Sequence, residues 1–218
     1  MRILLSYSKR HFDPNKKINP QRLEYSSAGT IAQGLYKSLQ KIGKVDYIDF
    51  NEQLTKREVQ YDLFVGIVNN FSKIVNFYHP KKTILIAVNM NPRERNKRLL
   101  SYIKRNKLGK SSIAKWDIQP AKTHLKSIKE ADIIFCFGNS FTYNSYVNCG
   151  TNQNKIKMFN YGSKLTPPAI KQCKRITNQK KRRFLYLASE IGLRKGFDLI
   201  QDIFIRNKYI LNKIEPFS

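Results

Sequence analysis

The fold of this 218-residue chain is decided by the stretch Ala131-Asp132-Ile133-Ile134-Phe135-Cys136-Phe137-Gly138-Asn139-Ser140. Its first part is almost continuously apolar, and a Gly-Asn-Ser turn then ends the run. A half-exposed strand alternates apolar and polar residues, whereas a continuous run of this length is typical of a strand that is covered on both faces. The stretch therefore predicts a buried strand over 131–137.

Five further short runs predict strands at 3–7, 45–50, 61–67, 83–88 and 155–159. Helical patterns lie between some of them. Residues 26–43 repeat their apolar side chains at helical spacing, with a serine at the start and Gly43 as the expected stop, and a basic helix is expected over 92–108. Strands that alternate with helices indicate an α/β fold, a Rossmann-like doubly wound parallel sheet.

Ligands of such sheets bind beyond the carboxyl ends of the strands, so the residues that follow each strand are the functional candidates. They are Ser8 and the loops 68–70, 89–91 and 138–140. From these loops we select Asn91, Gly138 and Asn139 as candidate substrate-binding residues.

The composition changes after residue 162. We interpret 1–162 as one domain, 163–182 as a linker with two consecutive prolines, and 183–218 as the first β-α unit of a second, incomplete Rossmann-like domain. One such unit cannot bury its own apolar faces. It must pack on the first domain, or the rest of the second domain is missing.

The charge balance is strongly basic, with 41 Lys and Arg against 15 Asp and Glu, a formal net charge of +26. This charge favours anionic partners, unless it reflects only a compositional bias with lysines on solvated faces. The three cysteines and three histidines lack metal-ligand spacing, so we expect no metal site. No apolar run is long enough for a membrane span, and we expect a cytoplasmic protein.

Two loop-to-helix turns can bind phosphate through free backbone N–H groups. The first is 26–30, where Gly29 permits close approach of the backbone, and the second is 187–200, which adds Ser189, Lys195 and Gly196. The alternatives are an ordinary helix cap for the first turn and a solvated basic turn for the second. No glycine-rich dinucleotide or P-loop motif accompanies either.

The second turn reads Leu187-Ala188-Ser189-Glu190-Ile191-Gly192-Leu193-Arg194-Lys195-Gly196-Phe197-Asp198-Leu199-Ile200. It resembles the first β-α unit of the donor domain in retaining GT-B glycosyltransferases of the family-four type. Residues 131–142 resemble that family's strand before the last helix of the acceptor domain, and residues 155–162 resemble its interdomain strand and turn. The order is the same along the chain, so the resemblance covers nearly all of it.

The resemblance implies transfer of a sugar from a nucleotide-diphosphate donor with retention of configuration, without a metal or another cofactor. It implies that Lys195 holds the diphosphate, with Ser189 and Gly196 nearby, and that Gly29 lines the cleft from the acceptor side. The acceptor is a glycan, a lipid-linked molecule or a small molecule.

The chain departs from the family pattern at three places. The paired glutamates of the donor domain have no counterpart before Ser218, so we expect a truncated chain that is inactive alone. Asn91 falls in the loop where the family often has a histidine, and the interdomain turn reads Tyr161-Gly162.

Two other functions remain open. A basic protein without catalytic activity could use the helix at 92–108 to bind an anionic membrane face or nucleic acid. Because no nucleic-acid motif accompanies the basic helix, we expect the membrane rather than nucleic acid. The chain could also be a split partner that completes another subunit.

Overall fold

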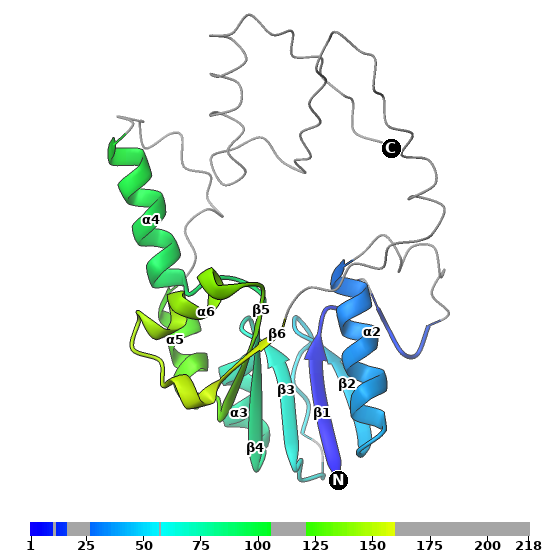
Figure 1. The fold of residues 1–218 in the computed structure, drawn as a ribbon. Coiled ribbons are helices and arrows are strands. Elements are labelled where there is room, and N and C mark those ends of the chain that lie inside the picture. Colours follow the sequence, from blue (N-terminus) through cyan, green and yellow to red (C-terminus); the bar gives the residue numbers. More distant parts are fainter. Residues whose placement is uncertain (11, 17–26, 57, 106–120, 160–218) are drawn as a thin grey trace, which may run out of the picture. The chain divides into compact units, whose positions relative to one another are not determined.

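The computed structural model describes residues 1–10, 12–16, 27–56, 58–105 and 121–159. In this part of the chain six strands form one all-parallel sheet in the order β2-β1-β3-β4-β5-β6 (Figure 1). The strands are β1 (Arg2–Tyr7), β2 (Lys44–Asp49), β3 (Leu63–Ile67), β4 (Lys82–Ala87), β5 (Ile133–Phe137) and β6 (Ile156–Phe159). The predicted α/β fold with a Rossmann-like parallel sheet is confirmed.

Helices lie on both faces of the sheet. They are α2 (Ser27–Gln40), α3 (Phe71–Tyr78), α4 (Pro92–Arg105), α5 (Ala121–Glu130) and α6 (Ser140–Val147), with a short 3₁₀ turn η2 (Gln153–Lys155) before β6. The chain moves from β1 to one side of the sheet for β2 and to the other side for all later strands. Because such crossovers are right-handed, α2 covers one face and α3, α5 and α6 cover the other.

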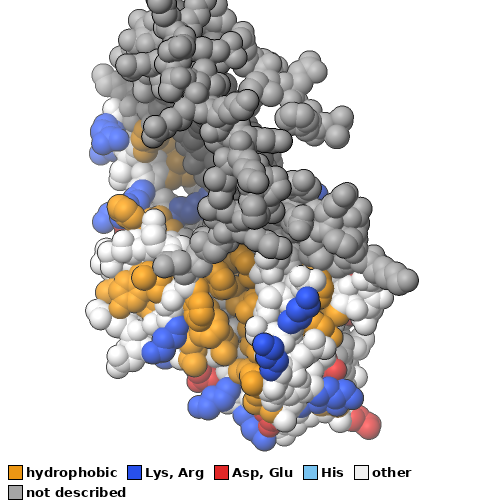
Figure 2. All heavy atoms as spheres, turned by 45° about the vertical axis from the view of Figure 1, so that its right-hand side comes forward, with side chains coloured by type: hydrophobic (Ala, Val, Ile, Leu, Met, Phe, Trp, Pro, Cys, Tyr) orange, Lys and Arg blue, Asp and Glu red, His pale blue; other side chains and the backbone are white. Residues whose placement is uncertain are grey.

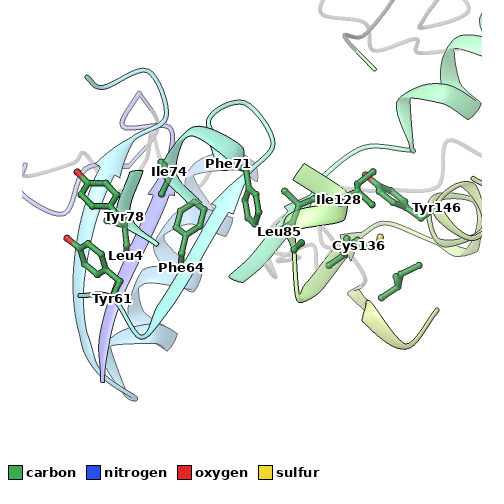
Figure 3. Packing of buried hydrophobic residues seen from close by; sticks show 14 of the residues in the cluster. Leu4, Tyr61, Phe64, Phe71, Ile74, Tyr78, Leu85, Ile128, Cys136 and Tyr146 are labelled. Atoms are coloured by element: carbon green, nitrogen blue, oxygen red, sulfur yellow. The ribbon is translucent and has the colours of Figure 1, made fainter. Parts of the chain in front are cut away.

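The larger core lies under α3, α5 and α6. Side chains of the sheet, among them Phe64, Leu85 and Cys136, pack there against Phe71 of α3 and Tyr146 of α6, and each of the five is fully buried (Figure 3). The second core lies under α2, where Ala32 and Leu39 pack on Ile3, Leu5 and Val65 of the sheet. The near-continuous apolar runs are explained by this two-sided burial.

Aspartates mark the places where two strands begin. The carboxylate of Asp62 accepts a 2.8 Å hydrogen bond from the backbone N–H of Arg2, and that of Asp132 accepts one of 2.8 Å from the N–H of Thr83. On the face shown in Figure 2, acidic side chains gather at the lower end, where the strands start, while basic side chains are spread more widely. These aspartates explain why β3 and β5 begin two residues later than predicted.

Gly43 was expected to end the first helix. Its N–H donates a 3.1 Å hydrogen bond to the carbonyl of Leu39 in the last turn, but the helix itself ends three residues earlier. Helix α2 already ends at Gln40, and the described glycines with positive φ are Gly138 and Gly150. Gly43 serves a close approach instead: a Cβ at this position would lie 2.4 Å from the carbonyl oxygen of Met1. The residue allows the turn after α2 to pack against the start of β1.

Several predicted features lie outside the described residues: Ser26, residues 106–108 of the basic helix, the linker 163–182 and the unit 183–218. Contacts within the chain separate Met1–Arg95 with Pro120–Tyr161, which contains the sheet, from Asn96–Gln119 with Gly162–Ser218. Among the described helices, none has the length and apolar character needed to cross a membrane.

Candidate functional site

An open pocket of about 530 Å³ lies at the carboxyl ends of the neighbouring strands β4 and β5. Its described lining comes from two loops and the first turn of α6: Val88, Asn89, Met90, Phe137, Gly138, Asn139 and Thr142. Parallel strands bring their carboxyl ends to one edge of the sheet, so the loops that follow β4 and β5 meet here. The pocket therefore occupies a place where this fold ordinarily binds ligands.

Asn139 lines the pocket and also begins α6. Its backbone is extended, as is usual for a residue that precedes a helix, and its side-chain oxygen accepts a 3.1 Å hydrogen bond from the N–H of Phe141. The oxygen is thereby engaged as a helix cap, while the amide nitrogen of the same side chain is a hydrogen-bond donor. The side chain can cap the helix and donate to a ligand at the same time.

Gly138 is the turn residue between β5 and α6, with φ of +138°. Its N–H donates a 3.0 Å hydrogen bond to the carbonyl of Phe159, which ties the turn to the end of β6. A Cβ at this position would lie 2.6 Å from Oγ1 of Thr142. Only glycine combines this backbone conformation with such a close approach, and the shape of the pocket wall depends on both.

Two consecutive residues of α6 hold the opposite loop in place. Oγ of Ser145 accepts a 2.9 Å hydrogen bond from the N–H of Asn91 and donates one of 2.6 Å to the carbonyl of Thr142. The hydroxyl of Tyr146 donates a 3.1 Å hydrogen bond to the carbonyl of Asn89. The two walls of the pocket are thus joined behind the lining residues.

A buried histidine supports this connection from α5. Nε2 of His124 lies 3.0 Å from the hydroxyl oxygen of Tyr146. Burial lowers the pKa of His124 to about 4 and raises that of Tyr146, so both side chains are neutral at pH 7. A pair of neutral, buried groups beneath the pocket is a structural element rather than an acid–base pair facing a substrate.

The structure does not bring all candidate residues of the first domain together in one site. Gly138 and Asn139 line the pocket, and the described lining includes neither Gly29 nor Asn91. Gly29 is buried in the first turn of α2, which follows β1, and β3 separates β1 from β4 in the sheet. The structure therefore does not bring Gly29 to the pocket.

Asn91 is completely buried directly behind the pocket loop. Its side-chain oxygen caps α4 by accepting a 3.0 Å hydrogen bond from the N–H of Arg93, and its carbonyl accepts one of 2.9 Å from the N–H of Arg95. Nδ2 is buried and has no hydrogen-bond partner among the described groups. The contacts that the structure gives Asn91 are those of a helix cap.

The expected diphosphate-binding residues Ser189, Lys195 and Gly196 lie outside the described residues. The part of the chain that the structure does describe contains no cluster of three or more His, Cys, Asp or Glu side chains that could hold a metal ion.

Sequence reasoning selected the loop 89–91 but chose Asn91 from it, whereas Asn89 and Met90 line the pocket. It also missed Thr142. Thr142 could have been found from its spacing. It follows Gly138 by four residues, which places it about one helical turn beyond the glycine and on the same side of the chain. Tyr146 and His124 gave no signal, since their roles depend on contacts between residues far apart in the chain.

No family model, curated protein or solved structure matches this chain significantly.

Proposed function

We propose that this chain is the acceptor-side part of a glycosyltransferase of the GT-B type, which uses a nucleotide-diphosphate sugar. The observation that carries the proposal is the pocket at the ends of β4 and β5, lined by Gly138 and Asn139. The motif at 131–142 that resembles the family includes these two residues and Thr142. The pocket is the place where the acceptor binds.

The chemistry of the pocket favours a neutral, hydroxylated acceptor group. In a chain of net charge +26, none of the described lining residues is charged. The amides of Asn89 and Asn139 and the hydroxyl of Thr142 supply donors and acceptors, and Phe137 supplies an aromatic ring. Amide groups beside an apolar ring suit a sugar ring, which has hydroxyls at its rim and C–H groups on its faces.

Phe137 is held in place by a second aromatic ring. Phe159 of the neighbouring strand β6 lies with its ring centroid 5.8 Å from that of Phe137, and the two planes are only 24° apart. A ring fixed in this way loses little conformational freedom when a ligand binds. Phe137 is the residue on which we expect the acceptor ring to pack.

Two binding experiments test the proposal, one for the donor and one for the acceptor. Calorimetry with a panel of nucleoside diphosphate sugars tests the donor half, and saturable binding of at least one of them is expected. Because the chain is expected to be inactive alone, binding rather than sugar transfer is the readout. If none of the donors binds, the donor half of the proposal is wrong.

Saturation-transfer NMR with neutral mono- and oligosaccharides tests the acceptor half. The variant Phe137→Leu keeps an apolar side chain but removes the aromatic ring. We expect it to weaken sugar binding roughly tenfold, which is the size of effect expected for the loss of one aromatic contact. Phe77→Leu is the matched control, since Phe77 is an exposed ring on α3. Equal effects of the two substitutions would remove the pocket from the proposal.

A further inference from the structure

Helix α4 carries two parallel rows of exposed side chains after its first turn. Lys97, Leu100 and Lys104 form one row, and Arg98, Ser101 and Arg105 form the next, each with spacings of three and four residues. All six side chains are exposed. We call them the basic surface of α4.

The basic surface contains no acidic side chain. Between Asn96 and Arg105 the sequence contains no acidic residue, and Glu94, the one carboxylate of α4, lies in its first turn. A concentration of positive charge of this kind attracts an anionic surface over the distance of a Debye length.

Leu100 distinguishes between two kinds of anionic surface. It lies between Lys97 and Lys104 in its row and is 50% exposed, although leucine gains nothing from water or from a phosphate backbone. At the boundary between headgroups and acyl chains the same side chain is buried, while the lysines beside it stay among the headgroups. An exposed leucine within a basic row therefore fits a bilayer better than nucleic acid.

We propose that the basic surface of α4 binds the face of an anionic lipid bilayer. Lys97, Lys104 and Arg105 supply the attraction to the headgroups, and Leu100 inserts at the acyl boundary. This attachment is independent of the pocket, and it holds whether or not the chain transfers a sugar.

Co-sedimentation with phosphatidylcholine vesicles, with and without phosphatidylserine, tests the attachment in the full chain. We expect binding only to the vesicles that contain phosphatidylserine, and weaker binding as the salt concentration rises. The double variant Lys97→Gln/Lys104→Gln should bind about 25-fold more weakly, at about fivefold for each charge removed.

The matched control is Lys122→Gln/Lys129→Gln, which removes the same charge from two exposed lysines of α5. If this variant loses as much affinity as the α4 variant, binding follows net charge alone and the proposal is wrong. Circular dichroism of both variants shows whether the fold is retained.

Leu100→Ser separates lipid from nucleic acid. It should weaken vesicle binding and leave binding to a polyuridine RNA unchanged, whereas Ile42→Ser, at an equally exposed apolar residue outside α4, should change neither. Vesicle binding that is insensitive to Leu100→Ser, together with tight RNA binding that depends on Lys97 and Lys104, would assign the surface to nucleic acid instead.

Discussion

The hydroxyl oxygen of Tyr146 lies 3.0 Å from Nε2 of His124, and both side chains are buried beneath the pocket. The same hydroxyl donates to the carbonyl of Asn89, 57 residues earlier in the chain. Since a tyrosine hydroxyl carries one proton, His124 must supply the other hydrogen through Nε2 when the Asn89 bond is made. Helix α5, helix α6 and the loop after β4 are thereby linked at one oxygen atom.

Removal of this oxygen should destabilise the protein. Tyr146→Phe leaves the carbonyl of Asn89 and the buried Nε2 of His124 without their shared partner, which costs about 1–3 kcal/mol of unfolding free energy. Urea denaturation measures the loss. Tyr143→Phe makes the same chemical change one turn earlier in α6, at a half-buried residue, and should cost less than about 0.5 kcal/mol. Similar losses in the two variants would show that the linkage contributes little.

The stability of the protein should depend on pH through His124. Its pKa is about 4 in the folded protein and about 6.5 in the unfolded chain, so the unfolded chain binds the extra proton first. The unfolding free energy should therefore fall as the pH drops from about 6.5 to 4, by about 3 kcal/mol for this group, and stay level above pH 7. The difference between the wild type and His124→Gln, measured across this pH range, isolates the contribution. A constant difference would contradict the assignment.

Gly138→Ala tests the turn that forms one pocket wall. The positive φ and the contact with Oγ1 of Thr142 together should cost about 2–4 kcal/mol. Adding Thr142→Ala removes the contact but not the backbone strain, so it should restore only part of the loss. Gly34→Ala is the control: this glycine is exposed within α2 and has nothing within 4 Å, so alanine should stabilise the protein by about 0.5–1 kcal/mol. Thermal denaturation ranks the four proteins.

Strands β1, β3, β4 and β5 could be predicted from the sequence because their side chains are covered on both faces. The runs 83–88 and 131–137 contain almost no polar residue, and the strands lie within two residues of the predicted ends. Helix α5 was not predicted, because the side that it buries includes the polar residues His124 and Ser127, which interrupt the apolar period. Helix α3 was not predicted either, because it has only eight residues and they are rich in aromatic and β-branched side chains, which are weak helix formers.

The pocket residues could be predicted only in part, because the sequence shows the sheet topology but not the contacts of individual side chains. The carboxyl ends of parallel strands indicated the loops that carry Asn89, Gly138 and Asn139, because topology alone brings these loops together. Which residue of a loop faces the pocket depends on caps and distant hydrogen bonds. Asn91 turns inward because its side chain caps α4 and its N–H donates to Ser145, 54 residues later.

Asn139 offers the sharpest test of the pocket, because its two functions can be separated. Asn139→Asp keeps the side-chain oxygen that caps α6, and a carboxylate at a helix N-terminus is favourable, so the unfolding free energy should change by less than about 0.5 kcal/mol. The substitution also replaces the amide donor by a negative charge inside a pocket whose described lining is neutral. A neutral sugar that accepts a hydrogen bond from Nδ2 should then bind at least about tenfold more weakly, the effect of one lost hydrogen bond of about 1.5 kcal/mol.

Asn152→Asp is the matched control, since Asn152 caps η2 through the same kind of hydrogen bond, 3.0 Å to the N–H of Asn154, and does not line the pocket. Calorimetric titration of both variants with the same saccharide decides the question, because unchanged affinity in Asn139→Asp would mean that the amide makes no contact with the ligand.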